Sequence, residues 1–260
     1  MTTGTQARST GAWAEARSHL DGLPAGRGLN IAHEPVDRHV LHGAGDTTAL
    51  RLVAVDETVT EVTYADLAGL TAAFANVLDT LEVRRGEVVF SLLGRDLDIF
   101  VAALGTLKHG SVFCPLFTAF GPEPIRQRLL LGHGRVLVTT AELYRRRVDA
   151  IRAGLRDLEH VLLVDAEPGE VPGTLSLRRL LERSAGSYEI PPTDPEEPAL
   201  LHFTSGTTGT PKGALHVHEA VVAHHSTAAT ALGLRPADVF WCTADPGWVT
   251  GTSYGIIAPL

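Results

Sequence analysis

The stretch Thr204-Ser-Gly-Thr-Thr-Gly-Thr-Pro-Lys-Gly213 is the most informative part of this sequence. It holds three glycines, five hydroxyl side chains, one proline and one lysine in ten positions. No acidic residue occurs from Ala199 to His218, although the whole chain carries 30. Glycines let backbone N–H groups approach an anion, hydroxyls donate hydrogen bonds, and lysine supplies a mobile positive charge. The composition therefore predicts a loop that binds a polyphosphate.

The spacing of this loop excludes two common phosphate-binding motifs. It is not Gly-x-x-x-x-Gly-Lys followed by Ser or Thr, nor the Gly-x-Gly-x-x-Gly of dinucleotide folds. The alternative for a Gly/Thr-rich loop is a simple surface turn. The embedded Pro211-Lys212-Gly213 and the apolar, strand-like lead-in at 199–203 favour phosphate binding over that alternative.

Two further blocks accompany the loop, and together they carry a family resemblance. They are Ala244-Asp-Pro-Gly-Trp-Val-Thr-Gly-Thr-Ser-Tyr-Gly255 and Gly110-Ser-Val-Phe-Cys-Pro-Leu-Phe-Thr-Ala-Phe-Gly-Pro-Glu-Pro124. The loop resembles the phosphate-binding signature of the adenylate-forming superfamily, which includes acyl-CoA synthetases, peptide-synthetase adenylation domains and luciferases. The first of the two blocks is similar to the acyl-pocket segment of AMP-forming acetyl-CoA synthetases. The resemblance extends from about Asp37 to Leu260.

The resemblance implies the N-terminal half of such an enzyme. Members of the family are roughly twice as long, and the expectation is that the segment reading adenine, the Thr-Glu near magnesium, the ribose-binding Asp and the C-terminal domain with its catalytic lysine are missing here. Many acetyl-CoA synthetases also have His where this chain has Thr252. The identity of the acyl group is therefore left open.

The implied reaction is that of an acetate–CoA ligase, with ATP, Mg²⁺ and CoA as co-substrates and a short-chain carboxylate as the group activated. Lys212 is the expected catalytic residue within the phosphate cradle. The cradle is assigned to Thr204, Ser205, Gly206, Thr207, Thr208, Gly209 and Lys212. Two other readings stay open: a non-catalytic, truncated nucleotide-binding fragment, and an adenylation domain that loads a carrier protein.

Two weaker site assignments follow from the same resemblance. Trp248, Val249 and Thr250 are expected to line the acyl pocket, after a tight turn at Asp245-Pro-Gly; the alternative is that Trp248 is a core residue. Arg145, Arg146 and Arg147 could meet the 3′-phosphate of CoA, because guanidinium groups bind phosphate in a bidentate manner. The alternative for the arginines is a solvated helix face.

Composition narrows the classes of partner. The net charge of −8 argues against nucleic acid or an anionic membrane. Cys114 and Cys242 match no metal or redox spacing, which suits free thiols and a cytoplasmic location. His216, His218, His224 and His225 lack the spacing of a zinc site, so no metal ligand is assigned.

The expected fold class is α/β, with mostly parallel, helix-covered sheets. Short apolar runs alternate with helical periodicities from about Thr48 to Asp165. Strands are expected at 49–55, 87–92, 112–114, 136–139, 161–164, 199–203, 214–217 and 239–243. Helices are expected from the near capping box Thr63-x-x-Asp66 to about Leu81, at 96–109 and 122–131, from about 141 to 158, and near 175–183 and 219–232. The predicted domains are a polar leader at 1–36, a first α/β subdomain at 37–165, a Pro/Gly/Glu-rich connection at 166–198, and the start of a second subdomain at 199–260.

Overall fold

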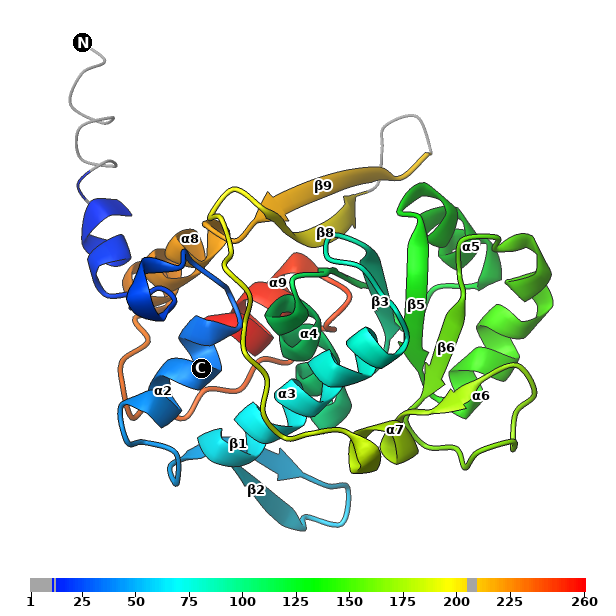
Figure 1. Ribbon diagram of the computed structural model, residues 1–260, viewed down its shortest axis with the longest axis horizontal. Coiled ribbons are helices and arrows are strands. Elements are labelled where there is room, and N and C mark those ends of the chain that lie inside the picture. Colours follow the sequence, from blue (N-terminus) through cyan, green and yellow to red (C-terminus); the bar gives the residue numbers. More distant parts are fainter. Residues whose placement is uncertain (1–10, 12, 205–209) are drawn as a thin grey trace.

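The computed structural model describes residues 11, 13–204 and 210–260. Its centre is a seven-stranded sheet in the order β7-β6-β5-β3-β4-β8-β9, beside a separate two-stranded hairpin of β1 and β2 (Figure 1). The strands are β1 Thr48–Val53, β2 Val59–Thr63, β3 Val88–Leu92, β4 Val112–Pro115, β5 Gly134–Thr139, β6 His160–Leu163, β7 Leu175–Ser176, β8 Pro198–Thr204 and β9 Lys212–Val217.

All neighbouring strands of the large sheet are parallel except β8 and β9, which form an antiparallel edge. The prediction of a mostly parallel, helix-covered α/β fold is thereby confirmed. The central strands β3, β4, β5 and β6 are buried on both faces because helices cover both sides of the sheet there. Alternate residues point to separate clusters: Val89 packs into one, and Phe90 into the other.

The helical segments connect these strands. The longer ones are α3 Tyr64–Thr80, α4 Leu97–His109, α5 Pro122–Leu131, α7 Leu177–Arg183 and α8 Ala220–Thr227. The short ones are η1 Pro24–Gly26, η2 His33–Asp37, α2 Arg38–Leu41, α6 Ala141–Leu143, η3 Tyr144–Val148, η4 Asp149–Gly154, η5 Ala228–Leu232, α9 Val249–Thr252 and η6 Ser253–Ile257. Figure 1 shows α3 and α4 on one side of β3, β5 and β6, and α5 on the other.

Local sequence signals define the ends of the main helices. Thr63 and Asp66 form a capping box at the start of α3, with each side chain accepting a backbone N–H of the other. Asp96 caps α4, and Gly110 ends it in the left-handed conformation at φ 86°. Helices α3 and α4 cross closely, since a Cβ on Gly105 would lie 2.7 Å from the Phe74 Cβ.

Two predicted elements differ from the structure. The expected helix after β5 is three short segments, α6, η3 and η4, although Tyr144, Val148 and Leu155 are buried together as predicted. The strand expected at 239–243 is wrong. That segment is irregular, and its apolar side chains Val239 and Trp241 are 81% and 83% exposed. An extended segment becomes a strand only with a neighbour to bond, and no described strand pairs with it.

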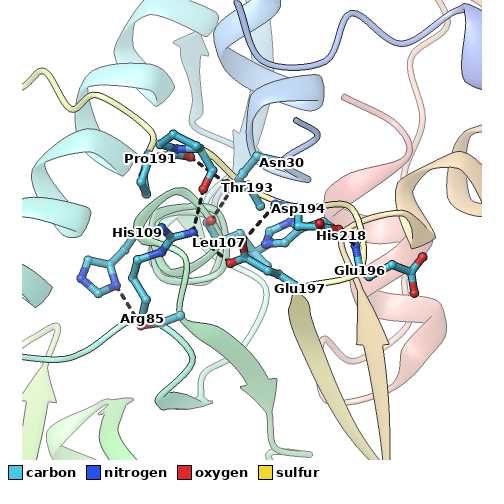
Figure 2. A network of polar contacts seen from close by, with 12 residues as sticks. Asn30, Arg85, Leu107, His109, Pro191, Thr193, Asp194, Glu196, Glu197 and His218 are labelled. Carbon is cyan, nitrogen blue, oxygen red and sulfur yellow. Dashed lines mark hydrogen bonds and ion pairs between the residues drawn. The ribbon is translucent and has the colours of Figure 1, made fainter. Parts of the chain in front are cut away.

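The Pro-rich end of the 166–198 connection is anchored by polar contacts (Figure 2). Arg85 donates to the Pro192 carbonyl at 3.0 Å and to the Glu197 carboxylate at 2.9 Å. Asn30 donates to the Leu107 carbonyl and to Thr193 Oγ1 at 2.9 and 3.4 Å. The backbone at Gly28, with φ at 110°, runs so close to Thr193 that a Cβ would meet the Thr193 carbonyl oxygen.

These contacts hold the connection against the N-terminal region and against the segment before β3. Strand β7 and helix α7 lie within the connection. Strands from both sides of the connection belong to one sheet, through the pairing of β4 with β8. The division into two subdomains stays a prediction. None of the described helices has the length and apolar character needed to cross a membrane.

Candidate functional site

The stem of the predicted phosphate loop is the hairpin of β8 and β9. Thr204, at the end of β8, lies in register with Lys212, at the start of β9. Thr204 Oγ1 donates to the Lys212 carbonyl at 3.4 Å, and both side chains are exposed. The position of the loop between two strands is as predicted. Ser205, Gly206, Thr207, Thr208 and Gly209 lie outside the described residues.

A line of aromatic contacts leads from this stem to the segment of the predicted acyl pocket. Phe203, one residue before Thr204, has its ring 5.9 Å from the guanidinium carbon of Arg128. The same guanidinium lies 4.2 Å above the Phe120 ring. Phe120 contacts Phe117 edge-on at 5.5 Å, and Phe117 contacts Trp248 at 5.3 Å between ring centroids.

This line brings together residues from four places in the sequence. Phe203 is on β8, Arg128 is on α5, Phe117 and Phe120 are in the loop after β4, and Trp248 directly precedes α9. Loops at the carboxyl ends of parallel strands are where open α/β sheets bind ligands. The stem of the phosphate loop and Trp248 are therefore connected through one continuous set of side chains.

The turn predicted at Asp245-Pro-Gly is present and is tied to the loop after β4. The Asp245 carbonyl accepts the N–H of Trp248 at 3.0 Å. The Asp245 side chain accepts the N–H of Gly247 through Oδ1 at 2.8 Å, and the hydroxyl of Thr118 through Oδ2 at 2.7 Å. A Cβ on Gly247 would lie 2.3 Å from the Phe117 backbone nitrogen, so the two segments touch backbone to backbone.

The side chains predicted to line the acyl pocket are at the surface. Trp248 is 49% exposed and Val249 is 44% exposed, and Thr250 is exposed as well. Trp248 is therefore not a core residue among the described residues. Thr252, which stands where many acetyl-CoA synthetases have His, is buried and donates to the Pro246 carbonyl at 2.9 Å. Its hydroxyl thus stabilises the turn.

The three arginines predicted to bind CoA do not share a common partner. Arg145 is 3.3 Å from Glu170, and Arg146 is 2.7 Å from Glu142 one helical turn earlier. Arg147 is half-buried, with its Nε unpaired among the described residues. Two of the three charges are thus balanced by nearby carboxylates, and a CoA-binding role for them stays a prediction.

Histidines gather on the sheet face beneath α8. The His202 and His216 rings are 5.7 Å apart, edge to face, and His224 Nε2 lies 3.2 Å from Ser253 Oγ. His218 Nδ1 accepts the N–H of Ile31 at 3.0 Å. Burial, with smaller contributions from neighbouring positive charge, lowers the pKa of His202, His218 and His224 to about 4. These three side chains are therefore neutral at pH 7.

Sequence reasoning missed the roles of Phe117, Thr118, Phe120 and Arg128, and it named Asp245 only as a turn residue and not as the partner of Thr118. Phe117 and Thr118 lie inside the block 110–124 that carried the resemblance, and Asp245 lies inside the block 244–255, so the segments were identified but their mutual contact was not. The periodicity of a sequence does not predict which residue of one loop bonds to which residue of another loop.

Comparisons with known proteins agree with this arrangement. Residues 37–260 match the AMP-binding enzyme family. The chain is 37% identical over 251 residues to the acetyl-coenzyme A synthetase of Bacillus subtilis, covering 95% of this chain and 42% of that protein. It is 30% identical to the acetyl-coenzyme A synthetase of Escherichia coli, covering 89% of this chain and 38% of that one. The chain thus spans less than half the length of these curated relatives.

Solved structures give the same result. The chain superposes on an acyl-CoA synthetase from Brucella canis with a TM-score of 0.84 and 31% identity, covering 95% of this chain and 44% of that one. It superposes on the anthranilate CoA ligase AuaEII, solved in complex with anthranoyl-AMP, with a TM-score of 0.81 and 26% identity, covering 91% and 44%. The sequence match, the sheet topology and the placement of the three blocks together show that this chain belongs to the AMP-binding enzyme family of adenylate-forming proteins.

Proposed function

We propose that the protein activates a short-chain carboxylic acid with ATP and transfers the acyl group to CoA, as an AMP-forming acetate–CoA ligase does. A carboxylate oxygen attacks the α-phosphorus of ATP, the bond from that phosphorus to the β-phosphate oxygen breaks, and pyrophosphate leaves. The CoA thiolate then attacks the acyl carbon, a thioester bond forms, and AMP leaves with the electron pair of the broken C–O bond.

The observation that carries this proposal is the contact line from Phe203 to Trp248. It links the stem of a glycine- and hydroxyl-rich loop with a half-exposed indole at the carboxyl end of a parallel sheet. Such a site can hold a polyphosphate at one end and a small apolar acyl group at the other. The relatives named acetyl-coenzyme A synthetase support the same reaction.

Within this proposal the loop stabilises the leaving pyrophosphate. The charge that develops on the β,γ-phosphates needs donors already in place, because these cost no reorganisation during the reaction. Lys212 is exposed at the first position of β9 and follows the hydroxyl-rich loop directly. Its ammonium group is free to reach an anion held by the loop, which suits a role as the catalytic cation.

At the other end, Trp248, Val249 and Thr250 would line the acyl pocket. A pocket of this kind separates neighbouring acyl lengths by only about 1–3 kcal/mol per methylene. Acetate, propionate and butyrate are therefore the substrates to compare. We propose that Arg145, Arg146 and Arg147 bind the 3′-phosphate of CoA. The proposed cellular location of the protein is the cytoplasm.

Magnesium is implied by the use of ATP. The described residues contain no group of three or more His, Cys, Asp or Glu side chains that could hold a metal ion. The phosphate oxygens of the nucleotide are the ligands that such an ion prefers.

The test is ATP–pyrophosphate exchange driven by acetate, propionate or butyrate, with the full-length gene product that contains residues 1–260. We expect carboxylate-dependent exchange, and roughly 10²–10³ slower exchange for Lys212→Ala, because one preorganised donor to the leaving group is lost. Lys108→Ala is not a suitable control, since that lysine is buried against Asp37. Arg51→Ala, on the exposed β1–β2 hairpin, is the matched removal of a distant positive charge.

Three outcomes separate the alternatives. No exchange with any carboxylate would favour a non-catalytic nucleotide-binding protein. Exchange without a CoA thioester product, but with acyl transfer to a carrier protein, would favour a carrier-loading adenylation domain. Exchange that Lys212→Ala leaves at the wild-type rate would remove Lys212 from the mechanism.

A further inference from the structure

The turn that carries Trp248 is fixed in two different ways, and only one of them is local. Asp245 Oδ1 accepts the N–H of Gly247, two residues later, and the Asp245 carbonyl accepts the N–H of Trp248. Such bonds form within the turn itself and would form wherever the turn sat on the molecule. They shape the turn, but they leave its orientation toward the rest of the site undetermined.

The second carboxylate oxygen makes a contact that is not local. Asp245 Oδ2 accepts the hydroxyl of Thr118 at 2.7 Å, across 127 residues of sequence. Thr118 lies three residues after the end of β4 and directly follows Phe117. The same short loop therefore supplies both the hydroxyl that holds the turn and the ring that contacts Trp248 at 5.3 Å.

The backbones around this bond leave little room for another arrangement. A Cβ on Gly247 would be 2.3 Å from the Phe117 nitrogen, and a Cβ on Gly251 would be 2.1 Å from the Asp245 carbonyl oxygen. The turn is thus pressed against the β4 loop on one side and against α9 on the other. A hydrogen bond to an ionised carboxylate is stronger than one between neutral groups, so Thr118 is well suited to hold this contact.

We infer that Thr118 is a positioning residue, which through the Asp245 carboxylate fixes the Trp248 indole against Phe117 and so sets how the protein discriminates among short carboxylates. This inference rests on the proposed function only for the identity of the substrate. The positioning of Trp248 is a property of the fold. The side-chain hydrogen bond of Thr118 goes to Asp245, so Thr118 acts through that carboxylate and is not assigned a contact with substrate.

The kinetic test compares Thr118→Val, which keeps the shape of the side chain and removes the hydroxyl, with Thr118→Ser, which keeps the hydroxyl. With the full-length gene product, Thr118→Val should raise KM for the preferred carboxylate about 10-fold, the cost of losing one charge-assisted hydrogen bond. The KM for ATP should not change, and kcat should change little, because the contact is equally present before and during reaction. Thr118→Ser should restore the wild-type KM.

The matched control is Thr80→Val, which removes a hydroxyl that bonds the Asn76 carbonyl at the exposed end of α3. This variant should leave both KM values unchanged. A Thr118→Val protein with the wild-type order and size of KM values for acetate, propionate and butyrate would overturn the inference. A rise in KM for ATP by the same factor as for the carboxylate would overturn it as well, since it would indicate a general loss of structure.

A spectroscopic arm tests the positioning without any enzymatic activity. In protein labelled with 5-fluorotryptophan, the ¹⁹F resonance of Trp248 is the one lost in Trp248→Phe. Thr118→Val should shift or broaden this resonance, Thr118→Ser should restore it, and Thr80→Val should not affect it. An unchanged Trp248 resonance in Thr118→Val would refute the inference. Absence of carboxylate-dependent exchange in the wild type, with the Trp248 resonance still dependent on Thr118, would refute the proposed function alone.

Discussion

Single residues determine how closely distant segments of this chain approach each other, and Gly28 shows this most clearly. Its φ of 110° is one that side-chain-bearing residues rarely adopt, and an added Cβ would overlap the Thr193 carbonyl. The bridge between Gly28 and Thr193 joins the N-terminal region to the connection before β8. A methyl group at residue 28 must therefore separate the two segments or force a new backbone conformation.

We expect Gly28→Ala to lower the free energy of unfolding by about 2–3 kcal/mol, the scale of a strained backbone position. Gly26→Ala is the matched control, because Gly26 also has a positive φ, of 69°, but has open space around its Cβ position. Urea unfolding measures both, with the midpoint changing and the m-value constant. Equal losses for the two variants would show that φ alone, and not the approach to Thr193, is what requires glycine at residue 28.

Residue types in the site were predictable where a motif names them, and unpredictable where a contact depends on docking. Lys212 and Trp248 can be assigned to the site from the sequence, as predictions, because their neighbours form recognisable motifs. Thr118 and Asp245 bond across 127 residues, and their meeting depends on how the β4 loop and the turn before α9 pack. Gly247 in that turn allows the close approach to Phe117. This contact joins residues too far apart in the sequence for any local pattern to reveal it.

Among the elements, α3 depends on a cap that can be tested by itself. Thr63 Oγ1 accepts the N–H of Asp66 at 3.1 Å, and Asp66 accepts the N–H of Thr63 at 3.1 Å. We expect Thr63→Ala to destabilise the protein by about 1 kcal/mol, the usual cost of losing an N-cap. Thr80→Ala, at the other end of the same helix, is the control, and thermal or urea unfolding is the measurement. A loss of less than about 0.3 kcal/mol for Thr63→Ala would mean that packing alone fixes the start of α3.

Elements with strong local signals were predicted well. Helix α5 was predicted to span 122–131 and does so, because Pro122 suits its first turn and Gly132 follows its last. The helix expected after β5 shares a buried face but is divided into three segments, since periodicity reports which residues are buried and not whether the backbone is regular. The strand expected at 239–243 failed because β-pairing depends on a neighbour elsewhere in the chain.

For the molecule as a whole, buried neutral histidines predict a loss of stability in mild acid. The unfolded chain protonates each imidazole near pH 6.5, whereas the folded protein holds the pKa of His202, His218 and His224 at about 4. Between these values the unfolded state binds more protons, so the free energy of unfolding falls as the pH falls. Each histidine contributes on the order of 1–2 kcal/mol to the loss between pH 7 and pH 5.

Urea unfolding at pH 7, 6 and 5 tests this expectation. His218→Asn places an amide oxygen where Nδ1 accepts the N–H of Ile31, and it should reduce the steepness of the pH dependence by about one histidine's share. Thr80→Val, which changes no titratable group, should leave the pH dependence as it is in the wild type. Equal stability at pH 7 and pH 5 in the wild type would contradict the prediction. It would mean that the folded protein binds as many protons as the unfolded chain over this pH range.

The fold class of the molecule could be predicted, because short strands that alternate with helices favour a parallel, helix-covered sheet. The order of the strands could not, since it depends on which segments lie together and not on local pattern. Neither could the antiparallel pairing of β9, although that pairing places Thr204 opposite Lys212 and so holds the two ends of the loop together.

The most direct measurement is a crystal structure of the full-length gene product with a non-hydrolysable ATP analogue. The β,γ-phosphate oxygens should lie within hydrogen-bond distance of backbone N–H and hydroxyl groups between Thr204 and Lys212. The α-phosphate should lie between the stem of the loop, at Thr204 and Lys212, and the Trp248 side chain. An analogue whose phosphates bind elsewhere on the protein, with this loop empty, would contradict the assignment of residues 204–212 as the phosphate cradle.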